Sequence, residues 1–380
     1  MFSDIVKKHH PKTVQVIFLF LVMKSFLWII PFGILACLLQ LAYISQVDDA
    51  TKSSWRRYIH HYTSSLASLS MQLAEFMDEN FTFSWQILQT ISSRDWFLCK
   101  YRECCIDSWT RHNITGLENG LSENLYGQPI AKNIVYKAVK LHLDNADPDK
   151  PLVLVFDGWS GSGKNFLSDL IAQHLYKNTD SKYVHRWIAG KDFPHQDKVH
   201  EYHGIIRETL LKNTNICGHS LFIVDEMDKL PVNVVDAFKP FLDHHRKIEG
   251  INFRRNIFIF LSNVAGEVIN KEMRLHLQNG GSRDDVNATH LETLLKTTIF
   301  NVANGLKDSA IIRHNLVDFF VPFLPLEREH VIKCALAEMR RRNKTENLSI
   351  ANLAADQLTY SGGFSNTGCK LIAKKLDLFL

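Results

Sequence analysis

The stretch at residues 151–166, PLVLVFDGWSGSGKNF, constrains the fold more than any other part of the chain. Its first half, Leu152 to Phe156, is an unbroken apolar run, which is typical of a strand buried on both faces of a parallel sheet. Three glycines then lead to Lys164 in the spacing G-x-x-x-x-G-K. Apolar residues recur at helical intervals after this lysine. A strand, a glycine-rich loop and a helix in this order predict a phosphate-binding loop.

This loop supplies nine consecutive candidates for nucleotide binding. Glycines let backbone N–H groups form a concave nest, and the helix N-terminus adds partial positive charge. Lys164 would reach the β- and γ-phosphates, whereas the Ser or Thr that usually follows it is Asn165 here. An amide oxygen can still meet a metal-bound water, so we expect altered rather than absent Mg²⁺ handling. The alternative, a glycine-rich turn beside a surface lysine, leaves the complete motif unexplained. The candidates are Gly158, Trp159, Ser160, Gly161, Ser162, Gly163, Lys164, Asn165 and Phe166.

Two further apolar runs end in polar residues that suit phosphate chemistry. Residues 220–229, SLFIVDEMDK, predict a buried strand that delivers Asp225 and Glu226 at its carboxyl end, where ligands bind in open α/β sheets. We expect Asp225 to hold Mg²⁺ through water and Glu226 to orient or deprotonate the attacking water. Residues 256–261 predict another strand, followed by Asn263. Asn263 either fixes the water or the γ-phosphate, or caps the next helix, and its spacing does not separate these alternatives.

The remaining patterns complete the predicted architecture. Residues 315–326 predict a strand ending in prolines, and residues 327–380 are mostly helical. The expected fold class is therefore α/β, a P-loop NTPase with a central parallel sheet flanked by helices and a small C-terminal helical domain. Tyr126, Gly127 and Gln128 precede the first strand and would cover an adenine. His195, His200 and His203 miss a metal-binding spacing and are expected to be loop and surface residues.

The front of the chain predicts a membrane anchor. Residues 26–44 carry no charge and are long enough to span a bilayer. Lysines precede this segment and Asp48 and Asp49 follow it, so the remainder is expected to be lumenal; a cleaved signal peptide is the alternative. The predicted organisation is a basic N-terminus at 1–24, an anchor at 25–45, a helical spacer at 46–120, a nucleotide-binding domain at 121–326 and a small domain at 327–380. A net charge of +4 without a long basic run argues against a nucleic-acid partner.

A lumenal location would allow glycosylation at the N-x-S/T sequons and disulfide formation by the cysteines. Triplets of the form N-x-S/T make candidates for glycosylation of Asn80, Asn113, Asn287, Asn343 and Asn347. Six of the seven cysteines follow the predicted anchor, where disulfides persist, although buried free thiols are the alternative. These six are Cys99, Cys104, Cys105, Cys217, Cys334 and Cys369.

The loop with Asn165, the DEMDK, FLSN and VPFLPLE segments and the late GCK triplet together resemble the torsin family of AAA+ ATPases, within the Clp-like branch. The resemblance covers residues from about 97 to the C-terminus. It implies ATP and Mg²⁺ as cofactors, Asp225 and Glu226 as the Walker B pair, Asn263 as sensor 1 and Lys370 as sensor 2. It also implies disulfides between Cys334 and Cys369 and between Cys99 and Cys217. The first of these would make nucleotide contact depend on lumenal redox state.

Two departures from ordinary AAA+ proteins bear on the mechanism. Leu316 stands where Clp-like relatives carry a charge-stabilising arginine, with Arg313 one turn away, so we expect weak hydrolysis by the chain alone. Torsins receive this arginine from the lumenal domain of a membrane-spanning cofactor, and we expect the same here, within an oligomeric ring at the endoplasmic reticulum or nuclear envelope. The WIAG segment, Trp187 to Gly190, fits a strand better than a pore loop. The alternatives are a self-sufficient homohexameric unfoldase and a nucleotide-gated scaffold with little turnover.

Overall fold

A computed structural model describes residues 105, 113–176, 180–301 and 309–380. All of them belong to the unit Asp95–Leu380. The predicted anchor at 25–45 and most of the predicted spacer lie outside these described residues. Within them, no helix combines the length and apolar character that a membrane crossing needs.

Five parallel strands form the central sheet, in the order β2-β3-β4-β1-β5. The chain moves from β1, which lies between β4 and β5, to the edge strand β2. It then returns across the sheet through β3 and β4 and passes β1 to reach β5, so consecutive connections lead to opposite sides of β1. Loops that leave the carboxyl ends separate at such a point, which makes it the usual ligand site of an open α/β sheet. The strands are β1 (Leu152–Gly158), β2 (Val184–Ile188), β3 (Leu221–Asp225), β4 (Ile257–Ser262) and β5 (Phe319–Phe323).

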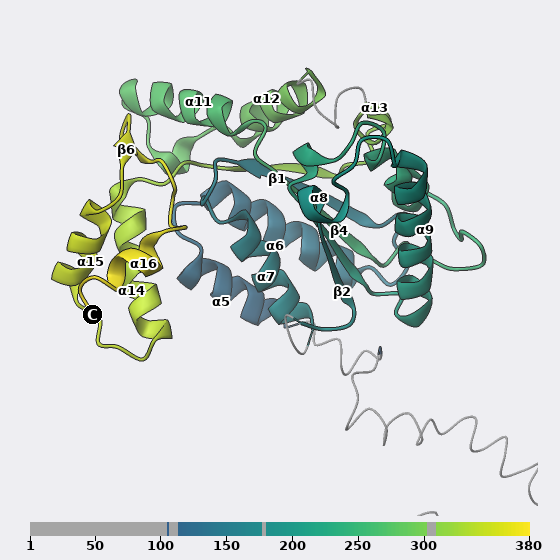
Figure 1. Ribbon diagram of the computed structural model, residues 1–380, viewed down its shortest axis with the longest axis horizontal. Helices are drawn as coiled ribbons and strands as arrows, with labels where there is room; N and C mark the ends of the chain where they lie inside the picture. Colours follow the sequence, from purple (N-terminus) through teal and green to yellow (C-terminus); the bar gives the residue numbers. More distant parts are fainter. Residues whose placement is uncertain (1–104, 106–112, 177–179, 302–308) are drawn as a thin grey trace, which may run out of the picture. The chain divides into compact units, whose positions relative to one another are not determined.

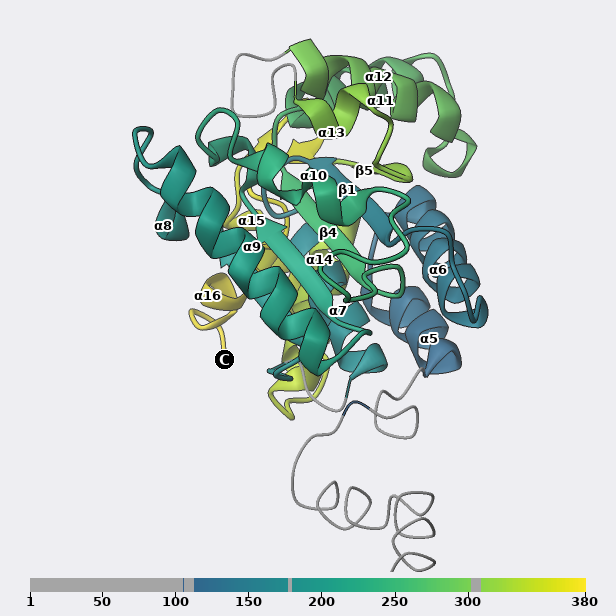
Figure 2. The ribbon, with the colours of Figure 1, turned by 90° about the vertical axis from the view of Figure 1, so that its right-hand side faces the viewer.

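Alternating residues of β1 pack against helices on opposite faces of the sheet. Leu154 and Phe156 lie in an apolar cluster with α5, α6 and α7, whereas Val153 and Val155 lie in a second cluster with α9, α11 and α12. All four side chains are at most 1% exposed, which explains the unbroken apolar run in the sequence. Figure 2 shows α9 on one side of the sheet and α5 and α6 on the other.

The helices of this three-layer domain are α5 (Ile114–Asn124), α6 (Pro129–Asp144), α7 (Lys164–Leu175), α8 (Ala189–Asp192), α9 (Val199–Ile216), α10 (Lys239–Leu242), α11 (Gly266–Gln278), α12 (Ala288–Asn301) and α13 (Ala310–Arg313), with single 3-10 turns at Met227–Lys229, Val235–Phe238 and Arg283–Asp285. Pro129 begins α6, where its missing N–H has no intrahelical partner to lose. The boundary placed between residues 120 and 121 falls inside α5, whose Leu117 and Leu121 are buried in the same cluster as α6 and α7. Helix α5 therefore packs as part of the nucleotide-binding domain.

Aromatic side chains stack across the three strands on one side of the sheet. Phe222 lies between Phe258, at a ring-centroid distance of 5.0 Å, and Trp187, at 6.0 Å. Phe238 packs edge-on against Trp187 at 5.8 Å. The structure thus places Trp187 inside β2 and in the core, as the sequence favoured, and not in a pore loop.

The C-terminal residues form a small separate core. Helices α14 (Arg328–Arg341), α15 (Leu348–Asp356) and α16 (Ile372–Leu376) pack around Val331, Ala335, Met339 and Leu376. A hairpin of β6 (Tyr360–Ser361) and β7 (Phe364–Ser365) lies beside them. Figure 1 shows these three helices gathered at one end of the described chain, in the yellow part of the ribbon. The fold therefore has the α/β domain and the small helical domain that the sequence predicted.

The structure corrects one of the two predicted disulfides. Cys334 and Cys369 are bonded, as the family resemblance implied, and join α14 to the loop before α16. The predicted pairing of Cys99 with Cys217 is wrong, because Cys217 is bonded to Cys105. Pairing depends on which sulfur reaches its partner in space, and linear spacing does not contain that information.

Candidate active site

The phosphate-binding loop connects β1 to α7 at the carboxyl edge of the sheet, as predicted. Gly161 has φ +77°, a conformation that side chains other than glycine rarely adopt. A Cβ atom at Gly161 would stand 1.9 Å from the carbonyl oxygen of Thr367, so the loop before α16 closes directly onto it. Gly163, with φ +111°, occupies the N-cap of α7. Residues Ser160, Asn165 and Phe166 are exposed around this turn.

Lys164 is folded back into the loop. Its Nζ donates hydrogen bonds to the carbonyl oxygens of Gly158, at 2.6 Å, and Trp159, at 3.0 Å. Burial lowers the pKa of Lys164 to about 8, although the neighbouring carboxylates of Asp157 and Asp225 act in the opposite direction. The side chain therefore still carries its proton at neutral pH and presents a positive charge inside the nest.

The two predicted metal-site residues are in contact. Asn165, in the first turn of α7, donates from Nδ2 to Oδ2 of Asp225 at 2.5 Å. Asp225 ends β3 at the same edge of the sheet. This contact turns the amide nitrogen toward the carboxylate. The amide oxygen is then available to accept a hydrogen bond from a metal-bound water.

Glu226 and Asn263 lie at the tips of neighbouring strands. Glu226 has φ +56°, which is uncommon outside glycine and concentrates at functional sites. Its Oε1 accepts a hydrogen bond from Lys229 Nζ at 2.7 Å. Asp228 in the same turn accepts from the backbone N–H of Asn263 at 3.3 Å and so ties the end of β4 to the end of β3. Asn263 is exposed and directly follows β4, so the structure brings both predicted catalytic residues to this edge.

The loop before α16 is hydrogen-bonded to the phosphate-binding loop. Cys369 donates its backbone N–H to the carbonyl oxygen of Gly161 at 3.1 Å. Trp159 donates from its indole nitrogen to the carbonyl oxygen of Asn366 at 2.7 Å. Lys370 is exposed, and its charge is close enough to contribute to the lowered pKa of Lys164. A disulfide-bonded residue of the small domain thus touches the backbone that would cradle a phosphate.

Asp157, which the sequence analysis did not single out, is fully buried at the end of β1. Its Oδ1 accepts the backbone N–H of Ala265 at 2.9 Å. Its Oδ2 makes no hydrogen bond to any described residue. Burial raises the pKa of Asp157 to about 6, against the opposing effects of Ser262, Ala265 and Lys164. The carboxylate therefore lies within electrostatic reach of Lys164.

Two polar side chains, one buried and one largely buried, join distant segments around the site. The first, Gln128, donates to the carbonyl oxygens of Ser162, at 3.0 Å, and Leu324, at 2.8 Å, and accepts from the N–H of Leu324 at 2.8 Å. It lies in the segment predicted to cover an adenine, but its bonds clamp the phosphate-binding loop to the end of β5.

Arg283 makes the second set of links. It donates to the carbonyl oxygens of Gly127, at 2.8 Å, and Pro325, at 2.6 Å, and to Oε1 of Glu327, at 2.6 Å. One guanidinium thus joins the segment before α6 to the connection between the two domains. No local sequence pattern distinguishes Arg283 or Gln128, because their partners are remote in the chain.

The other sequence candidates fall into three groups. The three histidines of residues 195–203 stand around the start of α9, and the described residues contain no cluster of metal-ligating side chains. Arg313 is exposed at the end of α13, whereas Leu316 is buried. The four sequon asparagines in the described region, at 113, 287, 343 and 347, are all exposed. Asn80 lies outside the described residues.

The arrangement fits a magnesium nucleotide. Backbone N–H groups, Lys164 and Lys370 suit a polyphosphate, and the carboxylates of Asp225 and Glu226 stand beside them to accept a metal-bound or attacking water. A Cβ added at Gly161 would collide with the facing loop. Glycine at this position therefore allows the two backbone segments to approach each other closely.

Comparisons with known proteins agree with this architecture. The fold is similar to that of Hsp104 in the S. cerevisiae Hsp104-ADP complex, with a TM-score of 0.52 at 20% identity, over 70% of this chain and 46% of that chain. The S. cerevisiae Hsp104:casein complex gives a TM-score of 0.53 at 21% identity over the same shares. The chain spans less than half the length of these solved chains. The five-stranded parallel sheet, the glycine-rich loop and the helical C-terminal domain therefore form a fold similar to that of these Hsp104 chains.

The family follows from sequence relatives. The Torsin family model matches residues 99–224, and the model of the Torsin-1A C-terminal domain matches residues 326–379. A torsin-like protein of Caenorhabditis elegans is 37% identical over 293 residues, covering 75% of this chain and 82% of the relative. A torsin-like protein of Drosophila melanogaster is 35% identical over 290 residues, covering 74% and 85%. The chain belongs to the torsin family.

Proposed function

We propose that this chain is a lumenal ATPase that binds ATP with Mg²⁺ and hydrolyses it when a partner completes the site. In this role it remodels protein or membrane assemblies at the endoplasmic reticulum or nuclear envelope. One observation carries the proposal. Lys164, Asn165, Asp225 and Glu226 converge at the carboxyl edge of the sheet, whereas the position expected to hold a charge-stabilising arginine is the buried Leu316.

Each polar side chain of the site has a role in this proposal. Lys164 and Lys370 balance phosphate charge from opposite domains. Asp225 and Asn165 hold the metal through water, and the bound Mg²⁺ would neutralise charge that develops on the phosphates. Glu226 orients or deprotonates the attacking water, and its hydrogen bond from Lys229 holds the carboxylate in place. Asn263, just beyond β4, positions the same water or the γ-phosphate.

The site lacks an obvious arginine of its own among the described residues. Leu316 carries no charge and is only 4% exposed within the apolar core, so this position cannot stabilise charge on a transferring phosphate. Arg313 is exposed at the end of α13, six residues before β5. An arginine supplied in trans accelerates phosphoryl transfer by about 10³–10⁵ in NTPases. We therefore expect slow hydrolysis until the lumenal domain of a membrane-spanning cofactor supplies that arginine, within an oligomeric ring.

Several features support a lumenal setting. Torsin family membership and the two disulfides favour the secretory pathway, where disulfides persist. Exposed sequon asparagines are compatible with glycosylation there. The uncharged segment at 25–45 would anchor the chain in the membrane with its C-terminus in the lumen.

Two other functions are less well supported. A self-sufficient Clp-like unfoldase would need an arginine from another copy of the chain and an aromatic pore loop, but Trp187 is buried in the sheet. A nucleotide-gated scaffold has no need of Glu226, which stands at the strand tip with a positive φ.

The test measures ATP hydrolysis by the full chain in detergent, alone and with the lumenal domain of a candidate membrane cofactor. Glu226→Gln keeps the size of the side chain and removes the base. We expect little turnover alone, stimulation of at least several-fold by the cofactor, and no stimulation in Glu226→Gln. Equal turnover by wild type and Glu226→Gln would contradict the ATPase assignment, and vigorous turnover without a cofactor would favour the self-sufficient unfoldase.

A further inference from the structure

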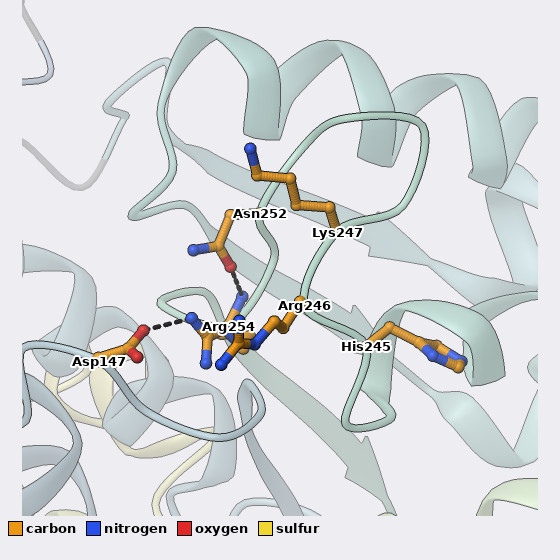
Figure 3. Close-up of a pocket in the computed structure, with 6 residues that line it drawn as sticks. All are labelled: Asp147, His245, Arg246, Lys247, Asn252 and Arg254. Carbon is orange, nitrogen blue, oxygen red and sulfur yellow. Dashed lines mark hydrogen bonds and ion pairs between the residues drawn. The ribbon is translucent and has the colours of Figure 1, made fainter.

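Asp157, the buried carboxylate at the end of β1, has no part in the chemistry proposed for the site. It differs from Asp147, which precedes β1 and is an exposed carboxylate paired with Arg254, as Figure 3 shows. Asp157 is fully buried, and its Oδ2 forms no hydrogen bond with a described residue. A buried carboxylate that no cation neutralises by direct contact is costly to keep in a core. The contacts that Asp157 does make are therefore informative about its role.

These contacts are with the turn that follows β4. In the parallel register of β1 and β4, Asp157 lies opposite Ser262, the last residue of β4. Its Oδ1 accepts the backbone N–H of Ala265 at 2.9 Å, three residues further along the chain. Burial raises the pKa of Asp157, and the Ser262 side chain acts in the opposite direction, so the hydroxyl lies close to the carboxylate. Asp157 thus meets the chain on both sides of Asn263.

Other hydrogen bonds fix the same turn. Oδ1 of Asp228 accepts the backbone N–H of Asn263 at 3.3 Å, and Oγ of Ser262 accepts that of Val264 at 3.1 Å. With the bond from Ala265 to Asp157, three successive N–H groups after β4 are bonded to side chains. A segment whose N–H groups all have fixed acceptors has few alternative backbone conformations. The direction of the Asn263 side chain is therefore set by these acceptors.

The acceptor from Asp157 is the one that water cannot replace. The hydrogen bond from Ala265 is buried, whereas the bond from Asn263 to Asp228 is exposed. Ala265 itself is 0% exposed. An exposed N–H that loses its acceptor bonds to water, but a buried one stays unpaired and favours a different backbone conformation. Loss of the Asp157 carboxylate should therefore loosen the turn more than loss of Asp228.

We propose that Asp157 is a positioning residue for ATP hydrolysis, because it holds the turn that carries Asn263 in register with the phosphate-binding loop. That loop begins at Gly158, the residue directly after Asp157. Asp157 touches neither the nucleotide nor the attacking water and acts through Asn263. This role rests on the proposed ATPase function. A displacement of about 1 Å in a positioning group can slow a reaction by about 10²-fold, so a loosened turn should slow hydrolysis.

Two substitutions of Asp157 form a matched pair. Asp157→Ala and Asp157→Asn both remove the charge, and with it the same influence on Lys164, but only asparagine keeps an oxygen that can accept from Ala265. Val155→Ala controls for lost packing, since it removes side-chain volume from the same face of β1. Val155 lies opposite Phe260 in β4, and therefore away from the turn.

Two measurements on the full chain in detergent test the proposal. The first is hydrogen–deuterium exchange of the peptide that contains residues 262–266, without nucleotide. Asp157→Ala should speed this exchange at least tenfold relative to Asp157→Asn. The second is single-turnover hydrolysis at saturating ATP and Mg²⁺, with the lumenal domain of a candidate membrane cofactor. Asp157→Ala should be at least tenfold slower than Asp157→Asn at equal ATP affinity, whereas Val155→Ala should match wild type.

A double-mutant cycle separates positioning from a general structural defect. Asn263→Ala should slow hydrolysis, and adding Asp157→Ala to it should slow hydrolysis no further, because Asp157 acts through Asn263. A general defect would lower the rate by the same factor in both backgrounds.

The proposal is overturned if the two Asp157 variants exchange equally, if they hydrolyse ATP equally fast, or if the two alanine substitutions act independently. Wild-type activity in Asn263→Ala would also overturn it, but would leave the ATPase assignment, which depends on Glu226. Absence of hydrolysis by wild type would contradict that assignment instead, and the exchange measurement would still decide whether Asp157 holds the turn.

Discussion

Replacing Asp157 by Asn should stabilise the protein at neutral pH and leave its stability unchanged in acid. Burial raises the pKa of Asp157 from its ordinary 3.8 to about 6. A raised pKa means that the folded state holds the proton more tightly than the unfolded state does. Stability from this group is therefore highest below pH 3.8 and is lost as the pH rises to about 6.

The size of this loss follows from the pKa. A tenfold change in proton affinity corresponds to about 1.4 kcal/mol, so keeping Asp157 ionised in the core costs the folded state about 3 kcal/mol at neutral pH. The asparagine side chain that replaces it would be neutral and nearly isosteric, and its amide oxygen can still accept from Ala265. Lys164 loses a favourable neighbour in this variant, which offsets part of the gain. We expect a rise in Tm of about 5 °C at neutral pH.

Scanning fluorimetry of the full chain at about pH 4 and about pH 7.5, on either side of the raised pKa, measures this difference. Asp157→Asn should melt higher than wild type at the neutral pH and at the same temperature at the acidic pH. The exposed Asp149, replaced in the same way, controls for the removal of a charge and should have little effect at either pH. A lower Tm for Asp157→Asn at neutral pH, or an equal difference at both pH values, would refute the reasoning.

Three further substitutions test the contacts around the site. Gly161→Ala places a Cβ 1.9 Å from a carbonyl oxygen of the facing loop, so it should weaken binding of a fluorescent ATP analogue at least tenfold. Gly280 has a similar positive φ but open space around it, so Gly280→Ala is the control and should not weaken binding. Arg283→Ala should lower the free energy of unfolding in urea by about 1–3 kcal/mol, because it leaves two carbonyl oxygens and the half-buried Glu327 carboxylate unpaired. Arg207→Ala, which removes an exposed ion pair, should cost less than about 1 kcal/mol. Reduction should change the ATP affinity of wild type but not of Cys369→Ser, and a variant that matches wild type under both oxidising and reducing conditions would exclude a redox effect.

Local patterns were sufficient to predict the main architecture. The run from Leu152 to Phe156 predicted β1 because a strand buried on both faces must be apolar at every position. Glycine spacing before Lys164 predicted the loop, since few other sequences allow its positive φ values. The pair Asp225 and Glu226 ends β3 as expected.

Contacts between remote residues were not predictable in this way. Arg283 bonds to Gly127 across 156 residues, and Gln128 bonds to Leu324 across 196. Only the assembled fold brings such partners together. Asp157 directly precedes the glycine motif, yet nothing in its neighbours indicates that β4 and α11 bury it.

Sequence spacing could also not decide which of two nearby cysteines forms the disulfide with Cys217. Cys99 and Cys105 are six residues apart, and either is compatible with a bond to Cys217 at the end of α9. The structure selects Cys105. By contrast, the bond between Cys334 and Cys369 was implied by the GCK triplet through its family resemblance.

The central claim is that the site is complete except for one arginine from a partner. The most direct test is single-turnover ATP hydrolysis by the full chain with the lumenal domain of its membrane cofactor, in wild-type form and with the cofactor's candidate arginine replaced by lysine. The account predicts stimulation by the wild-type cofactor, and loss of most of that stimulation with lysine even though the complex still forms. Undiminished stimulation by every single arginine-to-lysine cofactor variant would contradict it.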